Sequence, residues 1–159
     1  MKTLDFHIVP PLTSQTKQLV RSGIGFRTEA AYGEGYRSAK SVILHENDEL
    51  GNTSTISSVA SHLGLPGNAS VEEVFATIDK RFGSNAKAIW FASLTAVRHF
   101  YLDNPSDLDK IDVYTIPKKA IVIEDLGYDG ALFLMPLEDY EKMDVYNYIE
   151  WRKKKKERF

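Results

Sequence analysis

Three polar residues stand where a ligand-binding site can be built. His7 lies in an apolar run ended by two prolines, where an imidazole can offer one hydrogen-bond donor and one acceptor. Ser93 follows the strand-like run IWFAS and precedes a helical pattern, so its hydroxyl can cap the helix or form a polar floor. Glu141 belongs to an acidic group before MDVYN, where a carboxylate can accept from ribose hydroxyls and stabilise positive charge. Each residue also has an ordinary structural alternative: a core histidine, a helix cap and a solvated carboxylate.

Other catalytic motifs are missing from the sequence. The two G-x-G pairs, at 23–25 and 33–35, do not connect a strand to a helix, which excludes a Rossmann or phosphate-binding loop. The four histidines lack metal-ligand spacing, so no metal site is predicted, and no G-x-S-x-G elbow indicates a serine hydrolase. The absence of cysteine excludes disulfides, thiolate zinc sites and cysteine nucleophiles.

Length and composition predict one folded domain. The chain has 159 residues, of which 43% are hydrophobic and 26% charged, as in soluble globular proteins. No signal-peptide pattern or long apolar segment is visible, so we expect a cytoplasmic protein that does not span a membrane.

The charge is distributed unevenly along the chain. Six of the 20 basic residues and one of the 22 acidic residues lie in 152–159, which leaves 14 basic and 21 acidic residues for 1–151. We therefore predict a single domain over 1–151 and a basic C-terminal tail over 152–159, solvated and frayed. An acidic body repels phosphate backbones, so a nucleic-acid role would depend on the tail or on a local basic patch.

The first part of the chain predicts a strand, a helix and a long loop. Residues 4–9 form the strand, and Thr13 or Ser14 can cap a helix that Gly23 ends in a left-handed conformation. The glycine- and tyrosine-rich segment 23–38 shows no regular period, so we expect a loop able to fold over a ligand.

The middle of the chain is predicted to be mainly helical and its end mainly β. Residues 41–45 suggest a short strand, followed by a polar turn, whereas Ser70 and Glu73 form a capping box at the start of a helix. Further helices are expected at 54–63 and 93–102, and further strands at 86–93, 112–116, 120–123, 131–135 and 142–148. This order predicts an α+β protein with a mostly antiparallel sheet and a helical middle segment.

Three segments taken in order resemble the ADP-ribosyltransferase-fold superfamily in a diverged form. They are DFHIVPPLTSQTKQLVRSGI, AIWFASLTAVRHFYL and LGYDGALFLMPLEDYEKMDVYN. The resemblance covers about residues 4–24 and 87–148 and leaves roughly 40–85 unexplained. It implies a split β-sandwich with NAD⁺ bound in a cleft.

The resemblance also implies residue roles. His7 would hold the NAD⁺ ribose or carboxamide and assist catalysis, Ser93 would occupy the hydroxyl position of the second segment, and Glu141 would be the catalytic carboxylate, with Glu138 as the alternative. Tyr32 or Tyr36 would stack on the nicotinamide, an assignment that rests on residue type alone. The implied activity is a glycosyl transfer from NAD⁺ to a macromolecular acceptor, and a protein is the acceptor expected before any other. Toxins and effectors act in this way.

Two other functions remain open from the sequence. One is a non-catalytic α+β module that binds another protein, since a fold can lose catalysis and keep binding. The other is a nucleic-acid-associated factor, for which the basic tail is the only positive feature.

Overall fold

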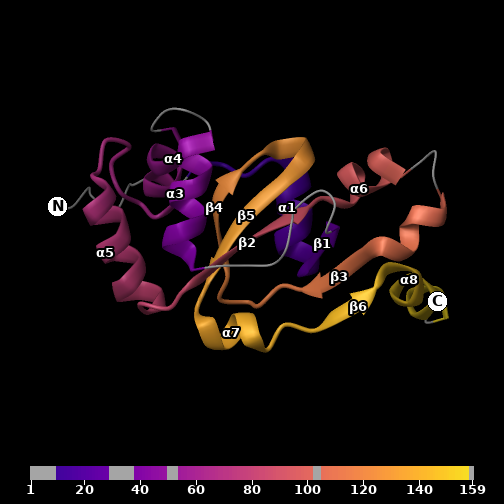
Figure 1. Ribbon diagram of the computed structural model, residues 1–159. Coiled ribbons are helices and arrows are strands. Elements are labelled where there is room, and N and C mark those ends of the chain that lie inside the picture. Colours follow the sequence, from indigo (N-terminus) through magenta and orange to yellow (C-terminus); the bar gives the residue numbers. More distant parts are fainter. Residues whose placement is uncertain (1–9, 29–37, 50–53, 102–104, 158–159) are drawn as a thin grey trace.

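Six antiparallel strands organise the part of the chain that the structure describes. In this computed structural model, residues 10–28, 38–49, 54–101 and 105–157 are described (Figure 1). The helices are α1 (Ser14–Ser22), α3 (Ala39–Glu49), α4 (Ser54–His62), α5 (Val71–Phe82), α6 (Leu94–Tyr101), α7 (Leu137–Glu141) and α8 (Tyr148–Glu157), with short 3₁₀ turns η2 (Pro105–Lys110) and η3 (Gly127–Asp129). The strands are β1 (Ile24–Thr28), β2 (Lys87–Ala92), β3 (Ile111–Thr115), β4 (Ile121–Asp125), β5 (Gly130–Met135) and β6 (Val145–Asn147).

The sheet consists of two three-stranded halves. Its strand order is β4-β5-β2-β1-β3-β6, and all neighbouring strands are antiparallel. β2 pairs with β5 over six positions and β1 with β3 over five, but β1 meets β2 at a single pair, Phe26 opposite Ala92. Arg27, which is buried, adds a side-chain bond across this joint by donating to the carbonyl oxygen of Trp90 at 2.9 Å.

The predicted α+β class is confirmed, with an antiparallel sheet and a helical middle segment. The described strands form one hydrogen-bonded sheet with a narrow joint, where a sandwich would have two separate sheets. The predicted strand over 4–9 lies outside the described residues.

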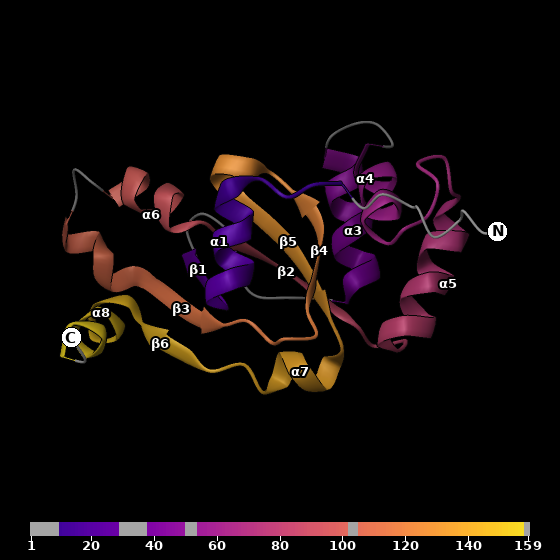
Figure 2. The same ribbon diagram turned by 180° about the vertical axis from the view of Figure 1, so that it is seen from behind.

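Helices cover both faces of the β4-β5-β2 half. Alternate side chains of these strands point to opposite faces, so Ala88 and Leu132 pack under α3, α4 and α5, whereas Ile89 and Phe133 pack with Leu19 of α1. Every residue of β5 is buried, as expected of a strand covered on both sides. Figures 1 and 2 show α3, α4 and α5 together beside β4, with α6 and α8 at the opposite end.

Three helix boundaries follow the capping signals in the sequence. Thr13 caps α1 by accepting from the backbone N–H of Thr16, and Gly23 ends it with φ 69°. Ser70 and Glu73 form the predicted capping box of α5. These predictions are confirmed, as are α4, α6 and the strands β2 to β5.

The prediction of a loop over 23–38 is wrong for its first part. Residues Ile24–Thr28 form β1, which lies between β2 and β3 in the sheet. Gly25 concealed the strand, because glycine is unfavourable in strands and interrupts the apolar pattern. Pairing with β3 supplies the order that local propensity lacks.

The short strand predicted at 41–45 is also wrong, because this segment belongs to α3. Val42 and Ile43 suggest a strand by residue type, yet Ala39 and Ile43 lie one helical turn apart and are both buried under the sheet. The Ser38 hydroxyl accepts from the N–H of Ser41 at 3.2 Å, a capping contact that marks the helix start.

The strand predicted at 142–148 is shorter than expected and two helices flank it. Pro136 precedes α7, and Glu138 and Asp139 lie in its first turn, where carboxylates stabilise the helix dipole. β6 is limited to Val145–Asn147. The predicted frayed tail is helical as far as residue 157, so the boundary predicted after residue 151 falls inside α8.

The joint between the halves leaves room for one aromatic ring. A Cβ on Gly25 would meet the Phe91 ring at 2.5 Å, and a Cβ on Gly130 would collide with the Phe91 carbonyl oxygen. Gly130 also has φ 137°, which other residues rarely adopt. Both positions therefore require glycine for the strands to approach Phe91.

We expect Gly130→Ala to lower the free energy of unfolding by about 2–5 kcal/mol, because it adds backbone strain and a collision with backbone atoms. Urea denaturation followed by circular dichroism measures the loss. Gly83→Ala is the matched control, since Gly83 has φ 91° but a Cβ there meets nothing within 4 Å. Its cost should be about 1–2 kcal/mol, and equal losses would contradict the packing role of Gly130.

Candidate functional site

Ser93 is a buried helix cap in this structure. Its hydroxyl donates to the carbonyl oxygen of Tyr128 at 2.7 Å and accepts from the N–H of Ala96 at 3.0 Å, and the residue is 2% exposed. These two bonds join the start of α6 to η3. The hydroxyl therefore acts in positioning the next residue, Leu94, and is not part of the lining of the pocket that contains Leu94.

Glu141 lies at the opposite end of β2 from Ser93. It is the last, exposed residue of α7, which follows β5, and Met135 at the end of β5 pairs with Lys87 at the start of β2. The six residues of β2 span about 20 Å. The structure does not bring Ser93 and Glu141 together, and Glu138 lies on the same exposed helix as Glu141.

The other predicted site residues, His7, Tyr32 and Tyr36, lie outside the described part of the chain. Their roles stay predictions, and so does the catalytic role of Glu141.

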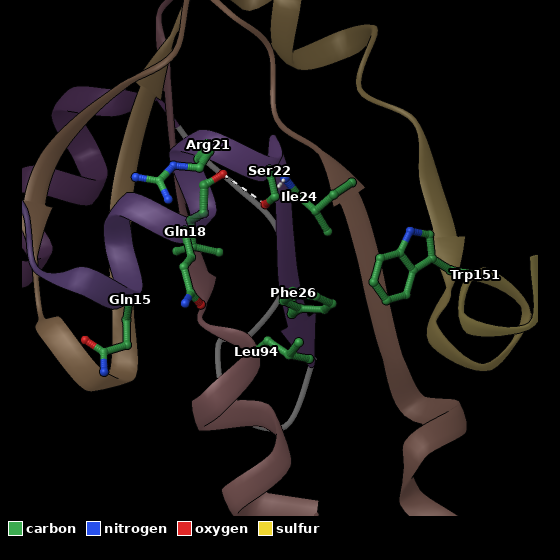
Figure 3. Close-up of a pocket in the computed structure, with 9 residues that line it drawn as sticks. Gln15, Gln18, Arg21, Ser22, Ile24, Phe26, Leu94 and Trp151 are labelled. Atoms are coloured by element: carbon green, nitrogen blue, oxygen red, sulfur yellow. Dashed lines mark hydrogen bonds between the residues drawn. The ribbon is translucent and has the colours of Figure 1, made fainter. Parts of the chain in front are cut away.

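A pocket of about 410 Å³ lies between α1, β1, α6 and α8. Figure 3 shows residues of α1 along one side and Trp151 of α8 on the other, with Ile24 and Phe26 of β1 between them. The polar lining residues are Gln15, Gln18, Arg21 and Ser22, and the apolar ones are Leu19, Ile24, Phe26, Leu94 and Trp151.

The apolar part of the pocket is built around aromatic rings. Phe26 and Trp151 meet edge to face, with ring centroids 5.8 Å apart, and Tyr148 packs against Phe26 at 6.1 Å. Phe26 and Tyr148 are each 3% exposed, so the partly exposed Trp151 supplies most of the ring surface that a planar ligand could meet. The volume fits a ring with a sugar or a similar group attached.

The polar part of the pocket comes from one helix. Gln15 and Gln18 offer both donors and acceptors, and Arg21 is the only charged residue in the lining that the structure describes. The Arg21 side chain is exposed and points away from Trp151 in Figure 3, so it can meet a ligand only outside the aromatic part of the pocket. This arrangement favours a neutral ring inside the pocket and an anionic group at its mouth.

Asp125 holds α1 against the sheet and thereby fixes one wall of the pocket. Its carboxylate accepts from Thr13 N–H at 2.9 Å, Thr16 Oγ1 at 2.7 Å and Gly127 N–H at 2.8 Å. Partial burial opposes ionisation of this carboxyl, but these donors outweigh it, and the pKa of Asp125 is lowered from its ordinary 3.8.

A second polar feature, Glu124, lies outside the pocket. A β-bulge between Val122 and Glu124 places its side chain at 8% exposure, and Oε1 has no hydrogen-bond partner among the residues that the structure describes. Burial, and next the charge of Glu46 on α3, raises the pKa of Glu124 to about 7. Glu46 is itself held by the indole N–H of Trp90 at 3.0 Å.

Sequence reasoning missed most of the pocket. Phe26 was assigned to a loop, and Trp151 to the end of the domain. Both are large aromatic residues, and this residue type was the signal that they could be buried or line a pocket. Gln15, Gln18 and Arg21 carry a helical signal, being three residues apart on α1. That spacing could have indicated one polar stripe, but not what the stripe faces.

Comparison with known proteins gives no relative: no family model, no curated protein and no solved structure matches this chain. Within the described ranges, no three His, Asp or Glu side chains are grouped so as to hold a metal ion. In the same ranges, none of the helices has the length and apolar content needed to cross a bilayer.

We expect Glu124 to make the protein less stable as pH rises. Because its folded-state pKa lies above the ordinary 4.5, the folded protein binds a proton more tightly than the unfolded chain and loses this stability between about pH 4.5 and 7. Glu124→Gln should flatten the dependence and raise Tm at about pH 8 by about 2–4 °C. Thermal unfolding across pH tests this, with exposed Glu138→Gln as control. The expectation would be contradicted if the Tm of the wild type rose between about pH 6 and 8 by more than the Tm of Glu124→Gln.

Asp125 should show the opposite pH dependence. Its lowered pKa means that the ionised form stabilises the fold above about pH 4, and that this stability is lost as the pH falls further. At about pH 7, Asp125→Ala should lower the free energy of unfolding by about 1–3 kcal/mol, because four donors from three residues lose their acceptor. Urea denaturation at pH 7 and 3 measures both effects, with exposed Asp144→Asn as control. No difference from the control at pH 7 would exclude this role.

Proposed function

We propose that this protein binds NAD⁺ in the pocket between α1 and α8, as an ADP-ribosyltransferase-like protein. The observation that carries the proposal is the origin of the lining. Gln15, Gln18 and Arg21 come from the first segment of the resemblance, and Leu94 comes from the second, so two segments far apart in sequence meet at one pocket.

The chemistry of the pocket supports a dinucleotide. An aromatic ring such as nicotinamide or adenine can lie against Phe26 and Trp151, and the glutamine amides can accept and donate to its polar edge. The pyrophosphate then reaches the rim, where Arg21 can pair with it in a bidentate manner. The lining described here contains no carboxylate that would repel the phosphates.

Transfer of ADP-ribose to a macromolecular acceptor is the activity that we propose for the bound dinucleotide. Departure of nicotinamide leaves positive charge on the ribose, which a carboxylate must stabilise. Glu141 is the residue assigned by the resemblance, but it does not belong to the pocket lining. Binding and transfer therefore have to be measured separately.

A second candidate is recognition of another protein through the same pocket. Its apolar side chains, which include a phenylalanine and a tryptophan, also suit an inserted apolar side chain of a partner. This candidate needs no catalytic carboxylate, and it becomes the better explanation if the pocket does not take NAD⁺.

Calorimetric titration with NAD⁺ tests the proposal. Arg21→Gln should weaken binding about 5- to 30-fold, because a charge-assisted phosphate contact contributes about 1–2 kcal/mol. Lys17→Gln is the matched control, an exposed cation on α1 that does not line the pocket, and it should leave affinity unchanged. Trp151→Leu should also weaken NAD⁺ binding, and in the Trp151→Leu background Arg21→Gln should weaken binding by the same factor as in the wild type.

Three outcomes decide between the possibilities. No heat of binding with the intact protein would exclude NAD⁺ and favour the protein-binding function. Equal losses for Arg21→Gln and Lys17→Gln would exclude the pocket as the site. If NAD⁺ binds, release of nicotinamide that Glu141→Gln abolishes without changing affinity would support transfer, and unchanged release would exclude Glu141.

A further inference from the structure

The strongest concentration of charge in the molecule lies on α8. Arg152 is followed by four consecutive lysines, all within the helix, whereas residues 1–151 carry 21 acidic and 14 basic residues. Arg152, Lys153 and Lys154 are exposed neighbours on this helix, and like charges so close together repel one another and favour a bound polyanion. α8 lies at one end of the molecule, away from α3, α4 and α5 (Figures 1 and 2).

The helix that carries these charges is anchored to the sheet. Tyr148 is 3% exposed and packs on Phe26 together with Trp151, and Ile149 joins the same cluster. Asn147 caps the helix by accepting from the N–H of Ile149 at 3.0 Å. The first turn of α8, directly before Arg152, is therefore anchored to the sheet.

An exposed aromatic ring lies beside the basic helix. Tyr146 belongs to β6, the last strand of the sheet, and is 39% exposed. The Lys154 ammonium lies 5.9 Å from the centre of the Tyr146 ring. A ring and cations side by side are the two components that single-stranded nucleic acids require, since bases stack on the ring and phosphates pair with the cations.

Other groups limit where a polyanion can lie. Glu150 in the first turn of α8 is exposed, and so is Asp112, which pairs with Asn147 across β3 and β6. Both carboxylates lie toward the start of the helix. The favourable region is therefore the exposed side of Arg152, Lys153 and Lys154 together with the Tyr146 ring.

We propose that this surface, formed by α8 and Tyr146 and called here the basic face, binds single-stranded nucleic acid. Phosphates lie along Arg152, Lys153 and Lys154, and one base stacks on Tyr146. A single strand fits better than a duplex, because the bases of a duplex are already stacked on one another and cannot use the ring. The proposal is independent of NAD⁺ binding in the pocket.

Fluorescence anisotropy with a labelled oligouridine and a matched oligothymidine tests the proposal. Lys153→Gln combined with Lys154→Gln should weaken binding about 3- to 10-fold at about 50 mM salt and make the plot of log affinity against log salt shallower by about 1–1.5. Tyr146→Leu should weaken binding about 5-fold or more with the slope unchanged, because it removes stacking and no charge. Binding of either oligomer supports the proposal, since both present phosphates and unstacked bases.

Matched controls separate the basic face from general charge and from misfolding. Lys118→Gln with Lys119→Gln removes two exposed lysines between β3 and β4, and Val145→Ala changes the exposed neighbour of Tyr146; both should bind as the wild type does. Circular dichroism of each variant should be unchanged. The proposal is overturned by absence of binding at about 50 mM salt, or by a loss of affinity in the lysine control equal to that of the Lys153 and Lys154 variant. It is also overturned if a duplex binds more tightly than the single strand and Tyr146→Leu leaves the affinity for the duplex unchanged.

Discussion

The packing of Phe91 at the joint of the sheet is the constraint on which the rest of the structure depends. Gly25 of β1 and Gly130 of β5 leave space for its ring and backbone, and a side chain at either position would collide with it. The ring lies 5.6 Å from Phe133 and 5.5 Å from Tyr114, so it joins one half of the sheet to the other. With one residue pair between β1 and β2, the relative position of the halves rests on this packing together with the hydrogen bond from Arg27 to Trp90.

The shape of the pocket depends on that joint. β1 contributes Ile24 and Phe26 to the pocket from one half, while α1 packs on the other half through Leu19. Asp125 fixes the start of α1, and Ser93 fixes the start of α6. Both networks lie where β2 ends and β5 begins, and they position the two helices that form walls of the pocket. By holding the starts of α1 and α6, Asp125 and Ser93 therefore also determine which side chains can meet a ligand.

Charge is distributed unevenly along the molecule. The β4 end contains the Glu124 and Glu46 carboxyl pair, whereas the α8 end carries the basic face. Trp151 belongs to both the pocket and α8, so a ligand of the pocket and a ligand of the basic face would meet the same helix. The resemblance to ADP-ribosyltransferases supports the pocket proposal only, and the basic face rests on charge and an exposed ring.

The sequence by itself determined the elements whose signals are local. These signals are a cap at Thr13 or Ser14, the Ser70–Glu73 box, Gly23 and the apolar runs of β2 and β5. They suffice because capping and burial patterns act over one or two turns. Only the tertiary structure decided that Ile24–Thr28 is a strand and residues 41–45 a helix, since pairing with β3 and burial under the sheet override weak propensity. It alone brought Trp151 to Phe26 and placed Glu141 at the far end of β2 from Ser93, because strand register sets such distances.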